Sequence, residues 1–364
     1  MSLPLIVDAH QDLAWNIQVF DRDYTRSVAE TRRLEAEANA PAIQYEGNAL
    51  IGWPEYQQGR VAIVFSTLFV SPARLKHEWD TIHYRDSIEA RRLYRKQLDI
   101  YHELVDRHPD KFRLVTSQSQ LEMILKDWDD ATNKTHPVGL VPLMEGAEGV
   151  GSPAELEGWW ETGVRIIGLA WAGNRYCGGT REPGPLTDEG QALIKVMASI
   201  GFTLDISHMD ELATRQVLDL YPGPIIASHA NSAAIIPEYT GNRHLSDDII
   251  KTLIAREGIV GLVPSCRFLN YGWKRGDPRQ AVSLEMAAAH IDHVCQIAGN
   301  SLHIGFGSDF DGGFGVEAVP GEFDTIADLQ KIGPILADKG YTKEDISAIF
   351  GGNWIRHLNS SLPT

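Results

Sequence analysis

Two polar patterns in this chain have the composition of metal-ion ligands and follow directly on apolar segments. His10 and Asp12 come after Leu-Ile-Val-Asp-Ala, and two residues apart in an extended chain their side chains point the same way. An imidazole nitrogen and a carboxylate oxygen so placed can bind one divalent cation. Glu145 comes after Val-Gly-Leu-Val-Pro-Leu-Met, and its two oxygens could bridge two cations. Taken singly, each pattern is better explained by unrelated polar residues in a loop or at the end of a strand than by metal binding.

Three further candidates stand at the ends of later apolar segments. His208 follows Phe-Thr-Leu-Asp-Ile-Ser, His229 follows Pro-Ile-Ile-Ala-Ser, and Asp309 follows Leu-His-Ile-Gly-Phe-Gly-Ser. A lone histidine at such a place is more often structural, and an Asp/Gly turn also explains Asp309. Two histidines after consecutive segments, with carboxylates upstream, favour a metal centre suited to two borderline cations such as Zn²⁺. A carboxylate at the position of Asp309 can take the proton of a metal-bound water.

The segments that carry these residues alternate with longer amphipathic stretches, which indicates βα units and a parallel sheet. Strands are expected at Leu5–Asp8, Val61–Leu68, Val138–Met144, Arg165–Leu169, Phe202–Ile206, Pro224–Ala227, Ile259–Val263 and Leu302–Phe306. Helices are expected at Trp79–His108, Pro153–Glu161, Asp188–Ser199, Met209–Leu220, Ser246–Glu257, Leu284–Ala298, Thr325–Lys339 and Thr342–Phe350. Eight such units predict an α/β protein with a single (β/α)8 barrel over residues 1–364, although a doubly wound open sheet with extra strands is also compatible. In a barrel, the carboxyl ends of the strands would bring the six candidate residues together.

The segment Asp21–Gly59 fits neither a strand nor a helix. It contains Asn48, Gly52, Pro54 and Gly59, so a long loop is expected at about residues 21–59, after the first strand. Long loops at the carboxyl ends of barrel strands commonly build the functional site.

Composition excludes several classes of partner. With a formal net charge of −16 over 364 residues, the chain is a poor candidate for binding nucleic acid or an anionic membrane. Its three cysteines are an odd number, widely spaced and without a CxxC pair, so no disulfide framework is expected. The beginning MSLPLIVDAHQD has no signal-peptide pattern, and no stretch is apolar for long enough to cross a membrane. We therefore expect a cytoplasmic protein with a small-molecule substrate, compatible with a homo-oligomer.

The order and spacing of the short motifs resemble those of the membrane (renal) dipeptidase family of zinc metallopeptidases. The resemblance covers nearly the whole chain. It rests on Asp8-Ala-His10-Gln-Asp12-Leu13, Glu145-Gly146, Gly184-Pro-Leu186-Thr187, Leu204-Asp205-Ile-Ser207-His208, Ser228-His229-Ala-Asn-Ser232, Asn242-Arg243, Gly307-Ser-Asp309-Phe-Asp311-Gly312 and Gly351-Gly352-Asn353. It implies a TIM barrel of the metal-dependent hydrolase type, related to the amidohydrolases.

The resemblance also implies a set of metal ligands. His10 and Asp12 look like ligands of a first zinc ion, and Glu145 looks like a ligand that bridges the two ions. His208 and His229 look like ligands of the second zinc ion. The expected cofactor is therefore zinc, two ions per chain, although the residues themselves do not distinguish Zn²⁺ from Mn²⁺ or Co²⁺.

Three other residues take roles in the same comparison. Asp309 is similar to the acid/base that handles the proton of a bridging hydroxide. Arg243 is similar to the arginine that meets the substrate's terminal carboxylate bidentately, with a surface residue beside Asp247 and Asp248 as the alternative. Trp171 stands at a substrate-binding position where renal-type enzymes carry a histidine. Because indole offers one N–H donor and cannot become cationic, this departure predicts weaker catalysis or a different substrate.

The predicted activity is metal-dependent hydrolysis of a small peptide-like amide by a bridging hydroxide on a binuclear zinc site. A dipeptide is the first candidate substrate, including dipeptides with a C-terminal D-residue. One alternative is an amidohydrolase that acts on N-acyl amino acids or on another small amide or lactone. The other is a catalytically weakened, metal-bound binding protein.

Overall fold

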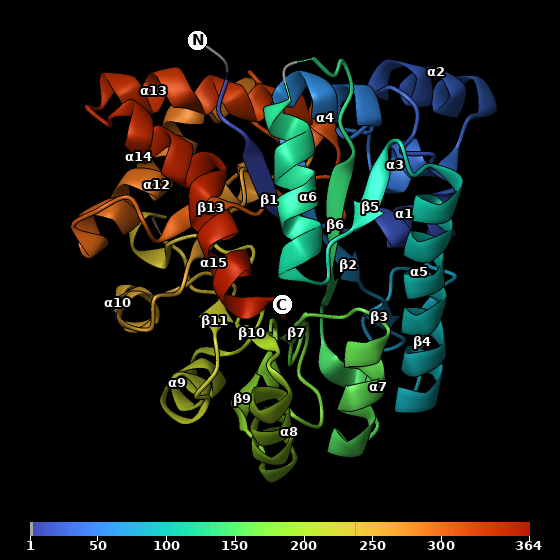
Figure 1. Cartoon of the computed structure of the whole chain (residues 1–364), viewed down its shortest axis with the longest axis vertical. Helices are drawn as coiled ribbons and strands as arrows, with labels where there is room; N and C mark the ends of the chain where they lie inside the picture. The colour runs from blue at the N-terminus through green and yellow to red at the C-terminus, as the bar shows by residue number, and fades with distance from the viewer. Residues whose placement is uncertain (1–2, 131, 237) are drawn as a thin grey trace.

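The computed structural model describes residues 3–130, 132–236 and 238–364, and a nearly closed barrel of eight parallel strands lies at its centre (Figure 1). The barrel strands are β1 (Ile6–Gln11), β2 (Val61–Leu68), β6 (Val138–Met144), β7 (Ile166–Gly168), β10 (Thr203–Asp205), β11 (Ile225–Ile226), β12 (Val260–Leu262) and β13 (Ile304–Phe306). They pair in the order β11-β10-β7-β6-β2-β1-β13-β12, and a parallel bridge between Ala227 and Val260 brings the two ends of this order together. The eight predicted strands and the predicted (β/α)8 barrel are confirmed.

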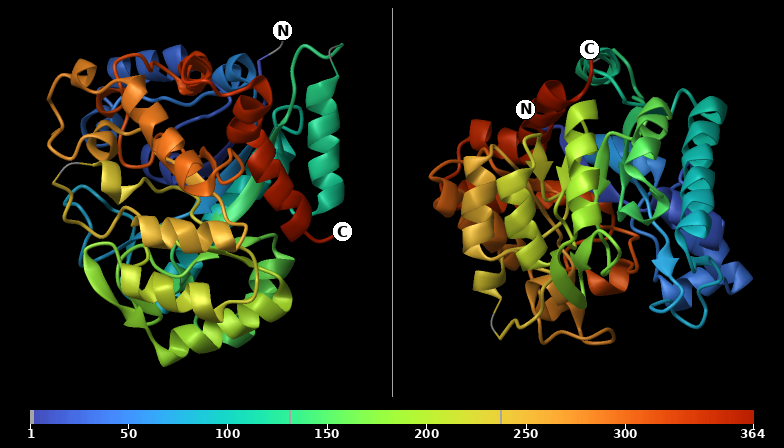
Figure 2. Two further views of the ribbon diagram at one scale, coloured as in Figure 1. Left: turned by 90° about the vertical axis from the view of Figure 1, so that its left-hand side faces the viewer. Right: turned by 90° about the horizontal axis from the view of Figure 1, so that it is seen from below.

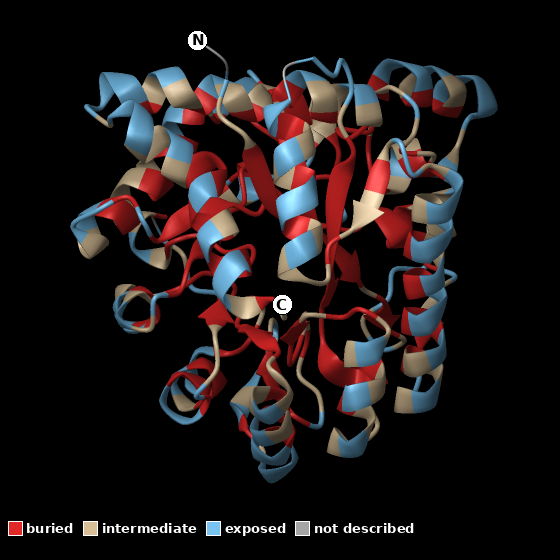
Figure 3. Cartoon of the chain, viewed as in Figure 1, coloured by how far each residue is buried: buried red, intermediate tan, exposed pale blue. Residues whose placement is uncertain are grey.

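The strands are buried on both faces, as Figure 3 shows for the centre of the molecule. Every residue of β1, β2 and β6 is buried, which is why β6 and the first part of β2 read as continuous apolar runs rather than as alternating patterns. The buried polar residues of β1 and β2 lie towards their carboxyl ends, near the candidate site. Two glycines allow the last strands to close on one another. A Cβ at Gly261 or at Gly307 would lie 1.8 Å from the carbonyl oxygen of Ser228. The close approach at these glycines positions the segment that follows β11.

Helices surround the barrel on its outer side (Figures 1 and 2). They are α5 (Ser87–Arg107), α6 (Gln118–Asp129), α7 (Leu156–Glu161), α8 (Asp188–Ile200), α9 (Glu211–Leu220), α10 (Asp247–Ala255), α12 (Leu284–Ala298), α13 (Ile332–Asp338), α14 (Lys343–Ser347) and α15 (Asn353–Ser361). The short helix α11 (Cys266–Leu269) instead follows β12 at the mouth of the barrel. The expected bounds of α12 are confirmed, whereas α6 and α15 were not predicted. Short strands lie outside the barrel order: β5 (Phe112–Leu114) beside β6, the pair β3 (Ser71–Pro72) and β4 (His83–Tyr84), and the hairpin β8 (Cys177–Gly179) and β9 (Glu182–Leu186).

The helix expected from Trp79 begins only at Ser87. The Asp86 side chain accepts hydrogen bonds from the N–H groups of Ile88 and Glu89, at 3.0 and 2.9 Å, and so caps α5. The residues before it form β3, β4 and the turn between them. The segment between β2 and α5 therefore extends over the mouth of the barrel.

The expectation of a long loop at residues 21–59 is wrong for much of its length. The connection from β1 to β2 contains α1 (Leu13–Phe20), α2 (Val28–Ala38), α3 (Pro41–Tyr45) and α4 (Trp53–Gly59). Pro41 and Pro54 lie in the first turns of α3 and α4, where a missing N–H and a fixed φ suit a helix start. Residues that suggested a loop therefore begin helices.

A buried ion pair network attaches this connection to the segment after β13. Arg22 lies 2.8 Å from Glu35 and 3.5 Å from Asp311, and all three side chains are buried. Asp311 also accepts a hydrogen bond from the Leu50 N–H at 2.8 Å. The helical connection is thereby held against the end of the barrel that carries Asp309.

The remaining sequence expectations concern cysteines and membranes. Cys177, Cys266 and Cys295 are buried and free, so the prediction of no disulfide framework is confirmed. Within the part of the chain that the structure describes, no helix is long and apolar enough to cross a bilayer.

Candidate metal centre

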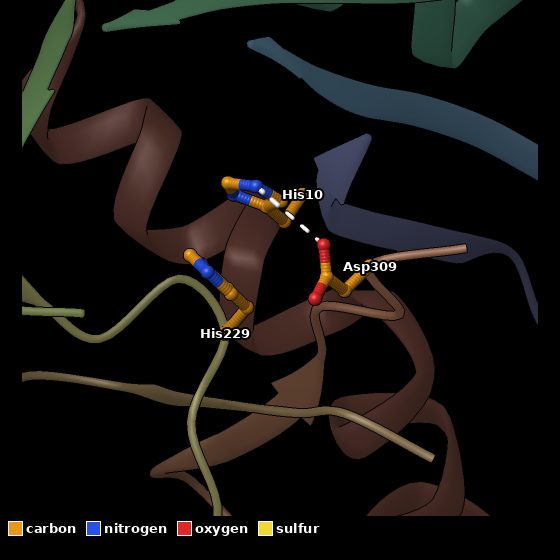
Figure 4. Close-up of side chains that lie close together, drawn as sticks. All are labelled: His10, His229 and Asp309. Carbon is orange, nitrogen blue, oxygen red and sulfur yellow. Dashed lines mark ion pairs between the residues drawn. The ribbon is translucent and has the colours of Figure 1, made fainter. Parts of the chain in front are cut away.

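The six residues proposed from the sequence as metal ligands or acid/base converge at the carboxyl ends of the barrel strands. Their ligand atoms form three overlapping groups, each within 4.8 Å. The groups are His10, Asp12 and Glu145; Glu145, His208 and His229; and His10, His229 and Asp309. Figure 4 shows the third group, with His10 and Asp309 facing one another. His10, Glu145 and His229 each belong to two of these groups, so the ligand atoms form one continuous cluster that could hold a metal ion.

The first half of the site surrounds the Nε2 atom of His10. This atom lies 3.7 Å from Glu145 Oε2, 3.9 Å from Asp12 Oδ2 and 3.9 Å from Asp309 Oδ1. His10 is fully buried in β1, and among the described residues neither of its ring nitrogens has a hydrogen-bond partner. The Thr67 hydroxyl, on neighbouring β2, donates to Asp12 Oδ1 and fixes that carboxylate.

The second half of the site places two imidazole nitrogens close together. Nε2 of His208 lies 2.9 Å from Nε2 of His229, and these atoms lie 3.0 and 3.4 Å from Glu145 Oε1. Thr180 Oγ1 lies 3.0 Å from His208 Nδ1 and also donates to the backbone carbonyl of His208. It therefore accepts a hydrogen bond from Nδ1–H, which leaves the Nε2 lone pair of His208 free for a metal ion.

A second relay fixes the tautomer of His229. Ser228 Oγ donates to Asp205 Oδ2 at 2.5 Å and lies 2.8 Å from His229 Nδ1. With its proton directed at Asp205, the hydroxyl accepts from Nδ1–H, so Nε2 of His229 carries the lone pair. Asp205 is itself held by the N–H groups of Ser207 and Ser228, at 3.0 and 2.9 Å. Such outer partners are typical of metal-binding histidines.

The donor set fits divalent cations of the zinc type. Burial lowers the pKa of His10, His208 and His229 well below the usual value, so the rings are neutral, the form that binds metals. Burial raises the pKa of Asp12 to about 6 and also raises that of Glu145. The Nε2 lone pairs of His208 and His229 face each other, and the buried ring of His10 has no hydrogen-bond partner among the described residues. Both features fit coordination of a metal ion by nitrogen and oxygen atoms.

Asp309 lies in a strained turn that brings its carboxylate into the site. Its φ is +57°, and that of His208 is +68°, a left-handed conformation that side chains other than glycine adopt infrequently. Burial, with Asp12 adding, raises the pKa of the Asp309 carboxyl. A Cβ at Gly312 would lie 2.2 Å from Asp309 Oδ1 and 3.0 Å from Asp12 Oδ2. Gly312 therefore leaves the space that both carboxylates occupy.

Arg243 is buried beside the second half of the site, with 9% of its surface exposed. Its Nη2 donates to the carbonyl of His229 at 2.8 Å. Within the described residues, its Nε and Nη1 have no hydrogen-bond partner. The surface alternative considered for Arg243 is wrong, and Asp247 pairs instead with His293 at 2.8 Å. Two buried, unpartnered donors on a planar cation suit a carboxylate ligand.

The site opens into a cleft of about 1060 Å³. Trp171 lines this cleft between Phe69 and His208, with ring centroids 5.2 and 6.1 Å away. The segment 21–59 contributes Tyr45 and Glu46 to the lining, so the expectation that it helps to build the site agrees with the structure even though its conformation does not. The cleft offers aromatic walls, a buried cation and carboxylates to a small ligand.

Sequence reasoning gave no role to the groups that support the ligands. Thr67 lies within an expected strand and Thr180 between two expected elements, and no local sequence pattern marks either hydroxyl. Asp205 and Ser228 lie inside motifs that had been recognised, where an acid within an apolar strand was the available signal. Glu46 was missed because it lies in the segment interpreted as a loop.

Comparisons with known proteins match nearly the whole chain to one protein family. The profile of the family described as "Membrane dipeptidase (Peptidase family M19)" matches residues 2–361. Dipeptidase verJ of Clonostachys rogersoniana is 27% identical over 312 residues, which cover 83% of this chain and 74% of that protein. Dipeptidase aclJ of Aspergillus oryzae is 26% identical over 320 residues, covering 85% and 69%.

Solved structures share the same fold. The structure of the dipeptidase AC, described as a metallo peptidase of family M19, has a TM-score of 0.78 at 21% identity and covers 100% of both chains. A metallo peptidase from Rhodobacter sphaeroides, liganded with a phosphinate mimic of the dipeptide L-Ala-D-Ala, has a TM-score of 0.78 at 20% identity. The match covers 99% of this chain and 100% of that one.

Proposed function

Because the chain belongs to the membrane dipeptidase family of metallopeptidases, family M19, we propose that it hydrolyses dipeptides at a centre of two zinc ions. The observation that carries this proposal is the sharing of Glu145 between two groups of ligand atoms. His10 and Asp12 would complete the first group, and His208 and His229 the second. Two cations so held would activate a water molecule and polarise the scissile carbonyl.

The chain's own residues supply the proton transfer and the orientation of the substrate. Asp309 faces His10 across the site, where its carboxylate can take a proton from the attacking water and deliver it to the leaving amine nitrogen. Arg243 would meet the C-terminal carboxylate of the substrate with Nε and Nη1, which have no partner among the described residues. The aromatic side chains that line the cleft would provide apolar contacts for the side chains of the substrate.

Two observations bear on the substrate. The Rhodobacter relative was solved with a mimic of L-Ala-D-Ala, which supports testing dipeptides with a C-terminal D-residue. Trp171 occupies the position where renal-type enzymes carry a histidine, and the loss of one oxyanion donor can lower turnover by about a hundredfold or more. We therefore propose slower turnover than in renal-type enzymes, or a preference for substrates that contact the indole.

The test is a dipeptide panel, with C-terminal L- and D-residues, assayed on protein supplied with zinc. We expect turnover by the native chain and a loss of about 10²- to 10⁴-fold in Asp309→Asn, since general acid–base catalysis has this size. Zinc content should stay unchanged in the variant. Asp80→Asn is the matched control, because Asp80 also lines the cleft but bonds to Ser71 and Ile82. An inactive native protein that holds zinc, or full turnover in Asp309→Asn, would contradict the proposal.

A further inference from the structure

One carboxylate of the cleft is buried and only half satisfied. Glu46 follows α3 directly and is 1% exposed, yet it lines the cleft. Its Oε1 accepts a hydrogen bond from the Gly313 N–H at 2.8 Å. Among the residues that the structure describes, none donates to Oε2. A buried charged oxygen without a donor is costly unless a ligand supplies one.

The position of Glu46 is fixed from two sides. Arg275, from the segment after α11, donates to the carbonyls of Gln44 and Tyr45 at 2.9 and 3.0 Å. The Tyr45 ring stacks on Trp79, with centroids 4.8 Å apart. The short helix that presents Glu46 is therefore clamped at the mouth of the cleft, and its carboxylate is a preorganised group.

Glu46 lies next to the first half of the metal centre. Its partner Gly313 follows Gly312, at which a Cβ would meet the carboxylates of Asp12 and Asp309. Arg243, by contrast, is bonded to the carbonyl of His229 in the second half. The cleft thus carries a carboxyl group whose Oε2 has no partner among the described residues beside one half of the centre, and a guanidinium group with two such donors beside the other half.

We propose that Glu46 binds the α-ammonium group of the substrate's N-terminal residue and that the enzyme therefore requires a free amine. This inference rests on the proposed dipeptidase function. A positively charged ammonium group can donate to Oε2 the hydrogen bond that this oxygen lacks. Burial raises the pKa of the Glu46 carboxyl to about 8, and a cation beside Oε2 favours the ionised form.

The inference separates dipeptides from N-acyl amino acids. Both kinds of substrate present a carboxylate to Arg243, but an N-acyl amino acid has no ammonium group and leaves Glu46 unpaired. Sites built around a buried polar partner reject analogues that lack it. The structure therefore favours zwitterionic dipeptides over acylated amino acids.

The experiment compares a dipeptide with its des-amino analogue, for example L-alanyl-L-alanine with N-propionyl-L-alanine, in native protein and in Glu46→Gln. The native protein should prefer the dipeptide. In the variant, kcat/KM for the dipeptide should fall about tenfold to a hundredfold, the size of a lost charged hydrogen bond, while the value for the des-amino analogue should change less than about threefold. Glu317→Gln is the matched control, because Glu317 lines the same cleft but both its oxygens accept hydrogen bonds from Asn48.

The outcomes are distinct. An equal loss on both substrates, or no loss on the dipeptide, would overturn the assignment of Glu46 and leave the dipeptidase function intact. If Glu46→Gln does not fold, the native protein still tests the inference, since equal kcat/KM for the two substrates would overturn it. A native protein that hydrolyses no dipeptide would overturn the proposed function and this inference with it.

Discussion

The relay from Asp205 through Ser228 to His229 predicts that a single amide substitution will weaken metal binding. In Asp205→Asn the side-chain oxygen should keep the two backbone N–H donors, from Ser207 and Ser228, so the amide nitrogen must occupy the place of Oδ2. The amide then donates to Ser228 Oγ, and the hydroxyl proton turns towards His229 Nδ1. The imidazole must then carry its proton on Nε2, the atom that faces Glu145 and His208.

The size of the effect follows from the number of hydrogen bonds at stake. To bind a cation at Nε2, the variant must move the proton of His229 back to Nδ1. There it faces the hydroxyl proton of Ser228, so that two buried donors meet without an acceptor. One buried hydrogen bond lost in this way costs about 1–3 kcal/mol, which corresponds to roughly fivefold to a hundredfold weaker zinc binding. The fold should persist, because all other partners of residue 205 remain.

The assay is zinc affinity by competition with a chelator, together with ¹⁵N chemical shifts of His229 in zinc-free protein. The native ring should be protonated at Nδ1 and the variant ring at Nε2. Asp86→Asn is the control, since Asp86 also accepts two backbone N–H groups but caps a helix on the outside of the barrel. Native zinc affinity in Asp205→Asn, or an unchanged tautomer, would refute the reasoning.

Three further substitutions test other contacts of the site. Thr180→Val removes the acceptor of His208 Nδ1–H and should weaken zinc binding about tenfold; chelator competition that gives the native affinity would count against that role. Gly312→Ala places a methyl group against Asp309 and Asp12, so kcat should fall about a hundredfold at an unchanged melting temperature; full kcat would mean that these carboxylates need no fixed position. Arg243→Lys loses the planar pair of donors, so steady-state kinetics should show KM for dipeptides raised about tenfold, and a native KM would exclude carboxylate binding by Arg243.

The barrel could be predicted from the sequence because its strands are buried on both faces. Val138–Met144 is a continuous apolar run, and Val61–Leu68 begins with five apolar residues before Ser66 and Thr67. The helices in the connection from β1 to β2 could not be predicted. Pro41 and Pro54 lie in the first turns of α3 and α4, and from the sequence alone a proline at a helix start looks the same as a proline in a loop. Likewise, the helix expected from Trp79 begins only after the N-cap residue Asp86, because the residues before it form β3, β4 and a turn.

In the candidate site, the ligands could be predicted from the sequence, whereas the groups that orient them could not. Residues at strand ends, such as His10, Glu145 and His229, could be found because a barrel brings all its strand ends together. The groups that orient them come from elsewhere in the chain. Thr180 lies in the turn between β8 and β9, and Glu46 lies at the end of a five-residue helix. Their roles depend on tertiary contacts that no local spacing encodes.

The central claim is that two zinc ions share Glu145. Anomalous diffraction at the zinc edge, from crystals grown with zinc, tests it most directly. We expect two peaks about 3.5–4 Å apart, with Glu145 between them, His10 and Asp12 beside one, and His208 and His229 beside the other. A single peak, or peaks away from Glu145, would contradict the account.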